Sequence, residues 1–350
     1  ADAAPRNAAT ARDLVVEPPT LIALGFEWYV DGDDNGNASV AVSYRRSAAA
    51  GAKPEDWHEA LPLVRLERGD RTAQYRLSVP LAQRPNLLAG SVFDLEPDTA
   101  YDVRLTMSDP DGVSGQRERI VKTHTRAEPK PAAGGRVFHV YPSDFKGTPQ
   151  RPAFVGLLAA YYDGPRIAAD NYNAYPVRVR PGDTILVHAG VYKGDRYVYG
   201  TSSVEVADDA PFPTGNPCCG ATFHGTYHLI ASGTADKPIV IKAAGDGPAI
   251  FDGDGNAVLF NVVAGNYTYF EGLTFRNTEV AIEAGQKGIA GAVGITVKHS
   301  RFENFGEGIH TDWSGSKDFY IADNEFYGRQ PAYVLVPWSL GTAAQVQGAR

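Results

Sequence analysis

The C-terminal half repeats one pattern in FEGLTFRN (270–277), VKHSRFEN (297–304) and IADNEFYG (321–328). In each stretch an apolar residue precedes a Phe by five positions, and successive Phe residues of this kind are 27 and 24 residues apart. A period of this size is typical of solenoids, in which similar coils stack on one another. The repeat therefore predicts a stack of coils rather than a globular arrangement of helices.

The apolar residues of each unit alternate with polar ones over short runs that end in Asn or Gly. This alternation favours short strands joined by tight corners. Stacked parallel strands lie about 4.8 Å apart, with one row of side chains inside the coil and one row outside. We expect functional residues in the outward row.

Composition narrows the class of protein. Gly (37 residues) and Pro (24 residues) are frequent, as expected for an all-β chain with many corners. The net charge of −8 argues against a nucleic-acid partner, because such proteins usually present a basic face. No apolar run approaches the roughly 18 residues that a membrane-spanning helix needs.

An N-terminal sandwich is predicted over 18–126, where short alternating strands are separated by turn clusters. LEPDTAY (95–101) places a Tyr at the start of a strand after a Leu-x-Pro corner, and Trp28 lies on an early strand. Together these features resemble a fibronectin type III domain, which implies a spacer or binding module. Residues 1–17 are predicted to be flexible and to follow a cleaved leader, which favours a secreted, periplasmic or cell-surface location.

A Pro-, Ala- and Gly-rich linker is predicted over 127–135. In the following domain, 136–350, the apolar run 154–162 is predicted to be a helix that caps the first coil. The motifs PGDTI…AGVY (181–192) and KPIVIKA…FDG (237–253) resemble the opening coils of right-handed parallel β-helix proteins of the pectate-lyase-like superfamily. That resemblance implies cleavage, epimerisation or binding of acidic polysaccharides, in several classes with Ca²⁺, or a structural or adhesive role.

Alignment of the repeats on their Phe residues makes Glu283 and His310 outward neighbours in one column. Glu307 lies on the same strand as His310, at a place where related glycoside hydrolases often carry a carboxylate. Asp312 shares the face of His310 if that strand continues. These residues form the densest titratable cluster that the sequence predicts, although solvated outward side chains and ion pairs between coils would give the same pattern.

A second outward column contains Glu271 and Lys298, with Arg301 nearby. We expect β-elimination of a uronate polysaccharide, which needs a base and a group that neutralises the carboxylate. Lys298 or His310 would be the base, and Arg301 the neutralising group. The alternatives are glycoside hydrolysis, which needs two suitably spaced carboxylates, and a non-catalytic structural, adhesive or filament-forming role.

Calcium and carbohydrate contacts are predicted at further residues. Glu283 and Asp312 are the candidate Ca²⁺ ligands, because Ca²⁺ prefers carboxylate oxygens. Within a long insertion between strands, Tyr197, Tyr199 and Tyr227 are candidates to stack on sugar rings. Packing of these aromatic residues against the sandwich is an equal alternative.

Two features remain open at the level of sequence. The adjacent Cys218 and Cys219 would form a strained ring, pair with another chain or stay free. The segment 333–350 contains no evident cap for the last coil, so we expect either further coils beyond it or self-association through the uncapped end.

Overall fold

The structure, a computed structural model, describes residues 5–66, 85–163, 176–193, 227–285, 290–311 and 315–329. The chain divides into two compact units, Ala1–Glu128 and Pro129–Arg350. The division falls inside the segment 127–135 that the sequence suggests as a linker.

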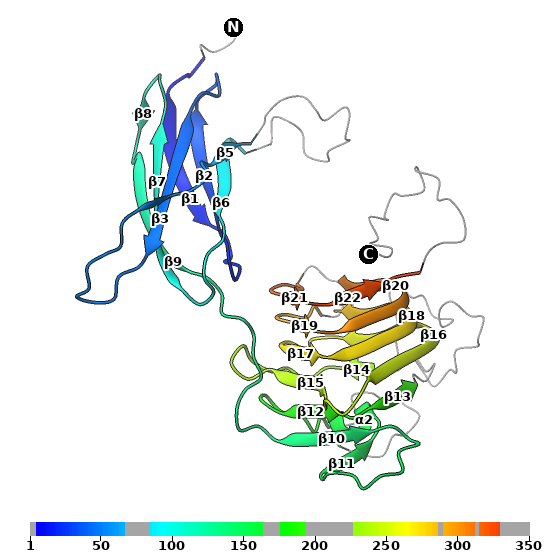
Figure 1. The fold of residues 1–350 in the computed structure, drawn as a ribbon. Helices are drawn as coiled ribbons and strands as arrows, with labels where there is room; N and C mark the ends of the chain where they lie inside the picture. The colour runs from blue at the N-terminus through cyan, green and yellow to red at the C-terminus, as the bar shows by residue number, and fades with distance from the viewer. Residues whose placement is uncertain are drawn as a thin grey trace, which may run out of the picture. The chain divides into compact units, whose positions relative to one another are not determined.

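The N-terminal unit is a sandwich of two sheets (Figure 1). One sheet has the order β5-β6-β2-β1-β8, with the bounds Val64–Arg65, Leu87–Val92, Leu24–Gly32, Ala9–Val16 and Val113–Ser114. The other has the order β4-β3-β7-β9, with the bounds His58–Glu59, Ser39–Arg46, Ala100–Ser108 and Glu118–His124. Alternate residues of these strands, among them Phe26, Trp28 and Leu105, fill the core between the sheets.

The first strand corrects one prediction. Residues 1–17 were expected to be flexible, but β1 pairs with β2 in antiparallel register from Ala9 to Val16. Ala9 and Ala11 face the core, and both are buried. The sequence signal is weak here because the inward positions carry small Ala side chains rather than large apolar ones.

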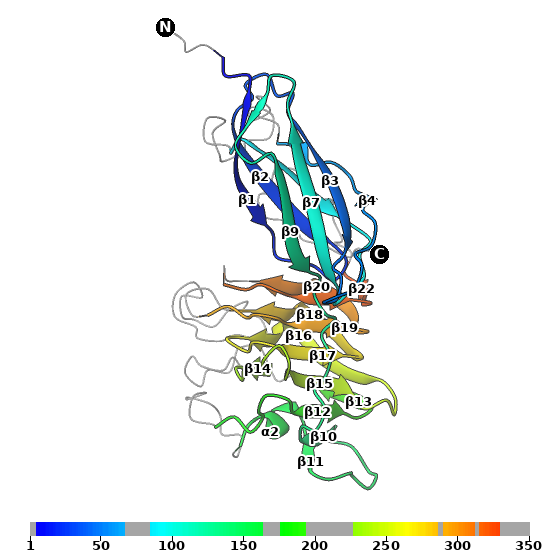
Figure 2. The same ribbon diagram turned by 90° about the vertical axis from the view of Figure 1, so that its left-hand side faces the viewer.

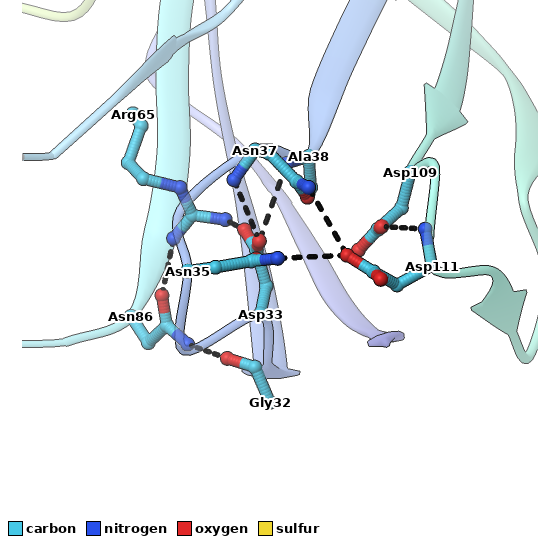
Figure 3. Close-up of polar contacts among 9 residues, drawn as sticks. All are labelled: Gly32, Asp33, Asn35, Asn37, Ala38, Arg65, Asn86, Asp109 and Asp111. Atoms are coloured by element: carbon cyan, nitrogen blue, oxygen red, sulfur yellow. Dashed lines mark hydrogen bonds and ion pairs between the residues drawn. The ribbon is translucent and has the colours of Figure 1, made fainter. Parts of the chain in front are cut away.

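Side-chain hydrogen bonds fix the loops of the sandwich at two places. The backbone N–H of Glu96 donates a 2.9 Å hydrogen bond to the buried hydroxyl of Tyr101, which is the geometry of a tyrosine corner. At another place, Asp111 accepts hydrogen bonds from the side-chain amides of Asn35 and Asn37 at 2.7 and 3.0 Å (Figure 3). These bonds join the β2–β3 loop to the β7–β8 loop.

The C-terminal unit contains two sheets of parallel strands, here called sheet I and sheet II (Figures 1 and 2). Sheet I has the order β11-β10-β12-β15-β17-β19-β21, with the bounds Ala153–Val155, Val137–Tyr141, Thr184–Val187, Ile239–Ala243, Thr268–Glu271, Thr296–Lys298 and Tyr320–Ala322. Sheet II has the order β13-β16-β18-β20-β22, with the bounds Gly190–Lys193, Ala249–Val262, Leu273–Ala284, Arg301–Thr311 and Glu325–Tyr327. In addition, β14 (Tyr227–Leu229) pairs with β16.

From β15 onward the chain passes alternately through sheet I and sheet II, which makes each pair of strands one coil of a parallel β-helix. The register joins Phe251, Phe275, Phe302 and Phe326 in one inner column. Their rings stack, with centroids 6.2, 4.9 and 4.6 Å apart along the column. The all-β prediction and the coil period based on Phe are confirmed.

The corners within sheet II depend on Asn. Asn277 and Asn304 have φ of 56° and 49°, a left-handed conformation that Asn adopts more easily than most residues. Asn304 donates a 2.8 Å hydrogen bond to the side-chain oxygen of Asn277 in the coil before it. The corners therefore stack on one another as the strands do.

The capping helix is shorter than the run 154–162 suggests. It is α2, Leu157–Tyr161, and the residues before it form β11. Leu157, Ala160 and Tyr161 are buried in the core cluster of the β-helix. Among the described residues, no helix is long and apolar enough to cross a membrane.

Candidate functional site

Four polar residues lie side by side on sheet II, one on each of four neighbouring strands. The register pairs His228 with Asn261, Asn261 with Glu283, and Glu283 with His310. These four residues are called the polar column below. The pairing of Glu283 with His310 is the one that the Phe alignment predicts.

The polar column faces outward because its sequence neighbours face inward. Phe260 and Ile282, each one residue before a column residue, belong to the core cluster, and successive side chains of a strand point to opposite faces. Burial changes along the column: Asn261 is 0% exposed and Glu283 6%, whereas the side chain of His310 is 40% exposed. Only the His310 end of the described column is open to a large ligand.

At that open end, His310 is oriented by Glu307. Nδ1 of His310 lies 2.7 Å from Oε2 of Glu307, three residues earlier on β20. A carboxylate bonded to Nδ1 holds the proton there and leaves Nε2 as the nitrogen that can take or give a proton. Nε2 makes no hydrogen bond within the part of the chain that the structure describes.

Next to His310, the carboxylate of Glu283 is held by the preceding coil. Nδ2 of Asn261 donates a 3.0 Å hydrogen bond to Oε2 of Glu283. A buried carboxylate is costly unless it is hydrogen-bonded, so Asn261 is part of what keeps Glu283 in this position. The site thus combines one buried and one half-buried carboxylate with an accessible imidazole.

Lys298 and Arg301 do not join this cluster. Lys298 ends β19 in sheet I, where it is 8% exposed and pairs in register with Glu271. Arg301 begins β20, before the Asn304 corner, and forms ion pairs with Glu303 and Glu325. Two carboxylates already neutralise Arg301, so its position gives no support to the neutralising role that the sequence suggested.

Of the three tyrosines predicted to bind sugar, Tyr197 and Tyr199 lie outside the described residues. Tyr227 is 6% exposed, and its ring stacks on Phe260 with centroids 4.7 Å apart. It fills the core, so the prediction that it lines a sugar groove is wrong. Cys218, Cys219 and the segment 333–350 also lie outside the described residues.

The calcium prediction remains a prediction. Asp312 lies outside the described residues, and Glu283 has one carboxylate oxygen bonded to an amide N–H. No group of three or more His, Cys, Asp or Glu residues in the described ranges is placed to hold a metal ion. These residues do not by themselves fit a Ca²⁺ site.

Sequence reasoning missed His228 and Asn261. In β18 and β20 the column residue follows the stacked Phe by eight positions, but in β16 it follows Phe251 by ten. The register of β16 shifts between Asp252 and Asn256, where a bulge adds residues. An eight-residue offset would have selected Leu259, which is a core residue.

Comparisons with known proteins identify no family for this chain. No family model matches the chain, and no curated protein matches it. One solved structure that it matches is described as "Structure of Yersinia enterocolitica Family 28 Exopolygalacturonase", at 12% sequence identity, with 91% of this chain and 70% of that chain covered and a TM-score of 0.23. A TM-score this low supports no inference about the function of this chain.

Proposed function

We propose that the chain cleaves a uronate-containing polysaccharide by β-elimination at the polar column, with His310 as the base. One observation carries the proposal, namely the 2.7 Å contact of Glu307 with Nδ1 of His310 at the open end of the column. An imidazole held in this way has its second nitrogen directed to a ligand, and a carboxylate partner stabilises the imidazolium that forms.

The chemistry needs a proton acceptor, a leaving group and a group that neutralises the uronate carboxylate, and Arg301, the neutralising group expected from the sequence, pairs with Glu303 and Glu325 instead. Nε2 of His310 takes the proton from C5 of the uronate, and the electron pair left on C5 forms the C4–C5 double bond. The C4–O bond breaks, and the departing oxygen takes up a proton. General base catalysis of this kind contributes typically 10²- to 10⁴-fold to the rate. Glu283 lies next to His310 in the adjacent coil and is 6% exposed, so the groups open to the sugar are those at the His310 end.

Hydrolysis is the second candidate, and a specific observation favours it. The structure gathers two carboxylates, Glu283 and Glu307, beside His310, whereas Lys298 and Arg301 lie elsewhere. Two carboxylates that flank a glycosidic bond are what hydrolases use as acid and as base or nucleophile. The two reactions differ in their products, which makes them separable.

A supporting role is proposed for the sandwich. We infer a fibronectin type III-like module that acts as a spacer or binding domain of a secreted protein. Support comes from the tyrosine corner at Tyr101 and from the division of the strands into two sheets, β5-β6-β2-β1-β8 and β4-β3-β7-β9, in which β5 and β8 are two residues long.

The decisive experiment is turnover on polygalacturonate, alginate and hyaluronan. Unsaturated products that absorb in the ultraviolet support elimination, and new reducing ends without that absorbance support hydrolysis. Absence of turnover on every polymer, with filaments in electron microscopy, would instead favour the structural role.

Variants test the site itself. We expect His310→Asn and Glu307→Gln to lower kcat by about 10²-fold or more, the effect of losing a general base or its partner. The matched control is Glu279→Gln, which removes an exposed carboxylate of β18 that pairs with Arg329. Turnover in His310→Asn equal to that of the control would refute the assignment of the base.

A further inference from the structure

A second group of titratable side chains lies at the start of the β-helix. Nδ1 of His139, in β10, lies 2.9 Å from Nε2 of His188, which directly follows β12. Nδ1 of His188 lies 2.7 Å from Oδ2 of Asp246, in the turn between β15 and β16. Three consecutive strands of sheet I are therefore joined by one chain of hydrogen bonds from Asp246 through His188 to His139.

The two imidazoles of this chain are enclosed by protein, whereas the side chain of Asp246 is 47% exposed. His139 is 9% exposed and His188 6%. The ring of Tyr141 stacks on the imidazole of His188, with centroids 4.1 Å apart and planes 9° apart. The other oxygen of Asp246 accepts a 3.0 Å hydrogen bond from the backbone N–H of Ala189. The partners are fixed, so the positions of the protons follow from the contacts.

With Asp246 ionised and both imidazoles neutral, only one arrangement satisfies both contacts. His188 donates its Nδ1–H to Asp246, which leaves Nε2 of His188 as an acceptor. His139 must then donate its Nδ1–H to that acceptor, and Nε2 of His139 carries no proton. The geometry thus assigns the tautomers of both rings.

Added protons affect this chain in two different ways. A first proton can reside on His188, where its charge is balanced by Asp246, while His139 changes its tautomer and becomes the acceptor. A second proton leaves an N–H on both nitrogen atoms of the 2.9 Å contact, and two cations then lie side by side in a buried place. Neither Coulomb repulsion nor the lost hydrogen bond is compensated there.

Among the residues that the structure describes, none brings a further negative charge into direct contact with His139. Tyr141 and Tyr192 are the titratable neighbours from β10 and β13, and β11 contributes only Ala153, Phe154 and Val155. Asp144 acts from the loop after β10, through its effect on Tyr192. On the outward face of sheet I, Leu186 separates His139 from Lys242, a cation.

The pKa of His139 agrees with this geometry. Burial lowers it first, and the charge of His188 lowers it further. Because the unfolded chain then binds more protons than the folded one near the ordinary value of 6.5, stability falls as the pH falls through that region.

We propose that the Asp246–His188–His139 chain is a pH-sensitive switch, which holds the first coil (β10, β11 and α2) on the second coil when His139 is neutral and releases it when both imidazoles are protonated. The inner column of stacked Phe residues in the later coils contains no ionisable group, so we expect the largest loosening in the first coil.

Amide hydrogen exchange of the full chain tests the switch. Between about pH 7.5 and pH 5, the range in which histidines change charge, we expect the protection factors of β10 amides to fall by about tenfold or more. The protection factors of β18 amides should fall by less.

His139→Asn places an amide donor where Nδ1–H lies and cannot be protonated, so its β10 protection should not depend on pH in this range. The control is His299→Asn, at an exposed corner with φ of 50° that Asn accepts, and it should behave as the wild type does. Constant β10 protection in the wild type, or an equal fall in His139→Asn, would overturn the proposal.

The ring nitrogens of the wild-type protein give a second test that needs no variant. Nuclear magnetic resonance should show His139 protonated on Nδ1 and not on Nε2 at about pH 7.5. The opposite tautomer at that pH would contradict the proton assignment, and with it the switch.

Discussion

The inner and the outer faces of β18 and β20 meet the neighbouring coils in different ways. Inside, Phe275 and Phe302 contact their neighbours through stacked rings, and any side chain of similar shape would satisfy the contact. Outside, polar groups meet specific partners of the neighbouring coil, as Arg276 meets Asp252 and Glu283 meets Asn261. The inner face therefore supplies most of the stability, whereas the outer face determines which chemical groups come together.

The largest expected effect is on the inner face. Phe302→Ala should lower the free energy of unfolding of the β-helix unit by about 3–5 kcal/mol, because it leaves a cavity between Phe275 and Phe326. Phe302→Leu keeps most of the volume and should cost less than about 1.5 kcal/mol. Urea titration followed by hydrogen exchange of β18 amides measures the loss of unfolding free energy in each variant. Equal losses in Phe302→Ala and Phe302→Leu would show that filled volume does not determine the stability of the inner contact.

An intermediate effect is expected at a buried carboxylate of the outer face. Asp252 is 6% exposed, and burial by itself would raise its pKa. Hydrogen bonds from Asn277, from the backbone N–H of Asp254 and from Arg276 outweigh burial and hold the pKa below its ordinary value. Asp252→Asn should therefore cost about 1.5–3 kcal/mol at neutral pH, the range for hydrogen bonds to a charged group.

The stability that Asp252 contributes should decrease as the pH falls. Because its folded pKa is lowered, Asp252 contributes stability at pH values above the unfolded pKa of 3.8, and that contribution is lost as the pH falls through the folded value. Urea midpoints between about pH 6 and pH 3 should fall more steeply for the wild type than for Asp252→Asn. Parallel curves would show that Asp252 adds nothing beyond an exposed ion pair such as Glu279 with Arg329.

The smallest expected effect is at the corners that connect the segments of sheet II. Asn304→Ala should cost about 1–2 kcal/mol, because Ala disfavours the left-handed φ of 49°. Asn304→Gly accepts this φ and loses only the exposed bond to Asn277, so it should be more stable than Asn304→Ala by about 1 kcal/mol. Thermal unfolding of the two variants measures this difference. A higher unfolding temperature for Asn304→Ala than for Asn304→Gly would contradict the role of the left-handed φ.

The predictions from sequence succeeded where a pattern repeats. The Phe spacing gave the register of Glu283 with His310 because β18 and β20 have the same number of residues between the stacked Phe and the column. Asn261 was missed because β16 carries a bulge. The repeat alignment brings Arg301 level with Glu325, as the register does, but a column does not show that the two side chains form an ion pair. A local sequence pattern predicts a strand, but it does not predict a bulge that shifts the register between neighbouring strands.

The sequence by itself determined the all-β class, the stacked coils and the Asn corners, since alternation of apolar residues and left-handed conformations are local properties that recur in each repeat. Only the tertiary structure decided which polar groups meet. His139, His188 and Asp246 are separated by 49 and 58 residues and share no motif. Their contact exists because the stacking of sheet I brings the ends of β10, β12 and β15 together, and hydrogen bonds act only over that short distance.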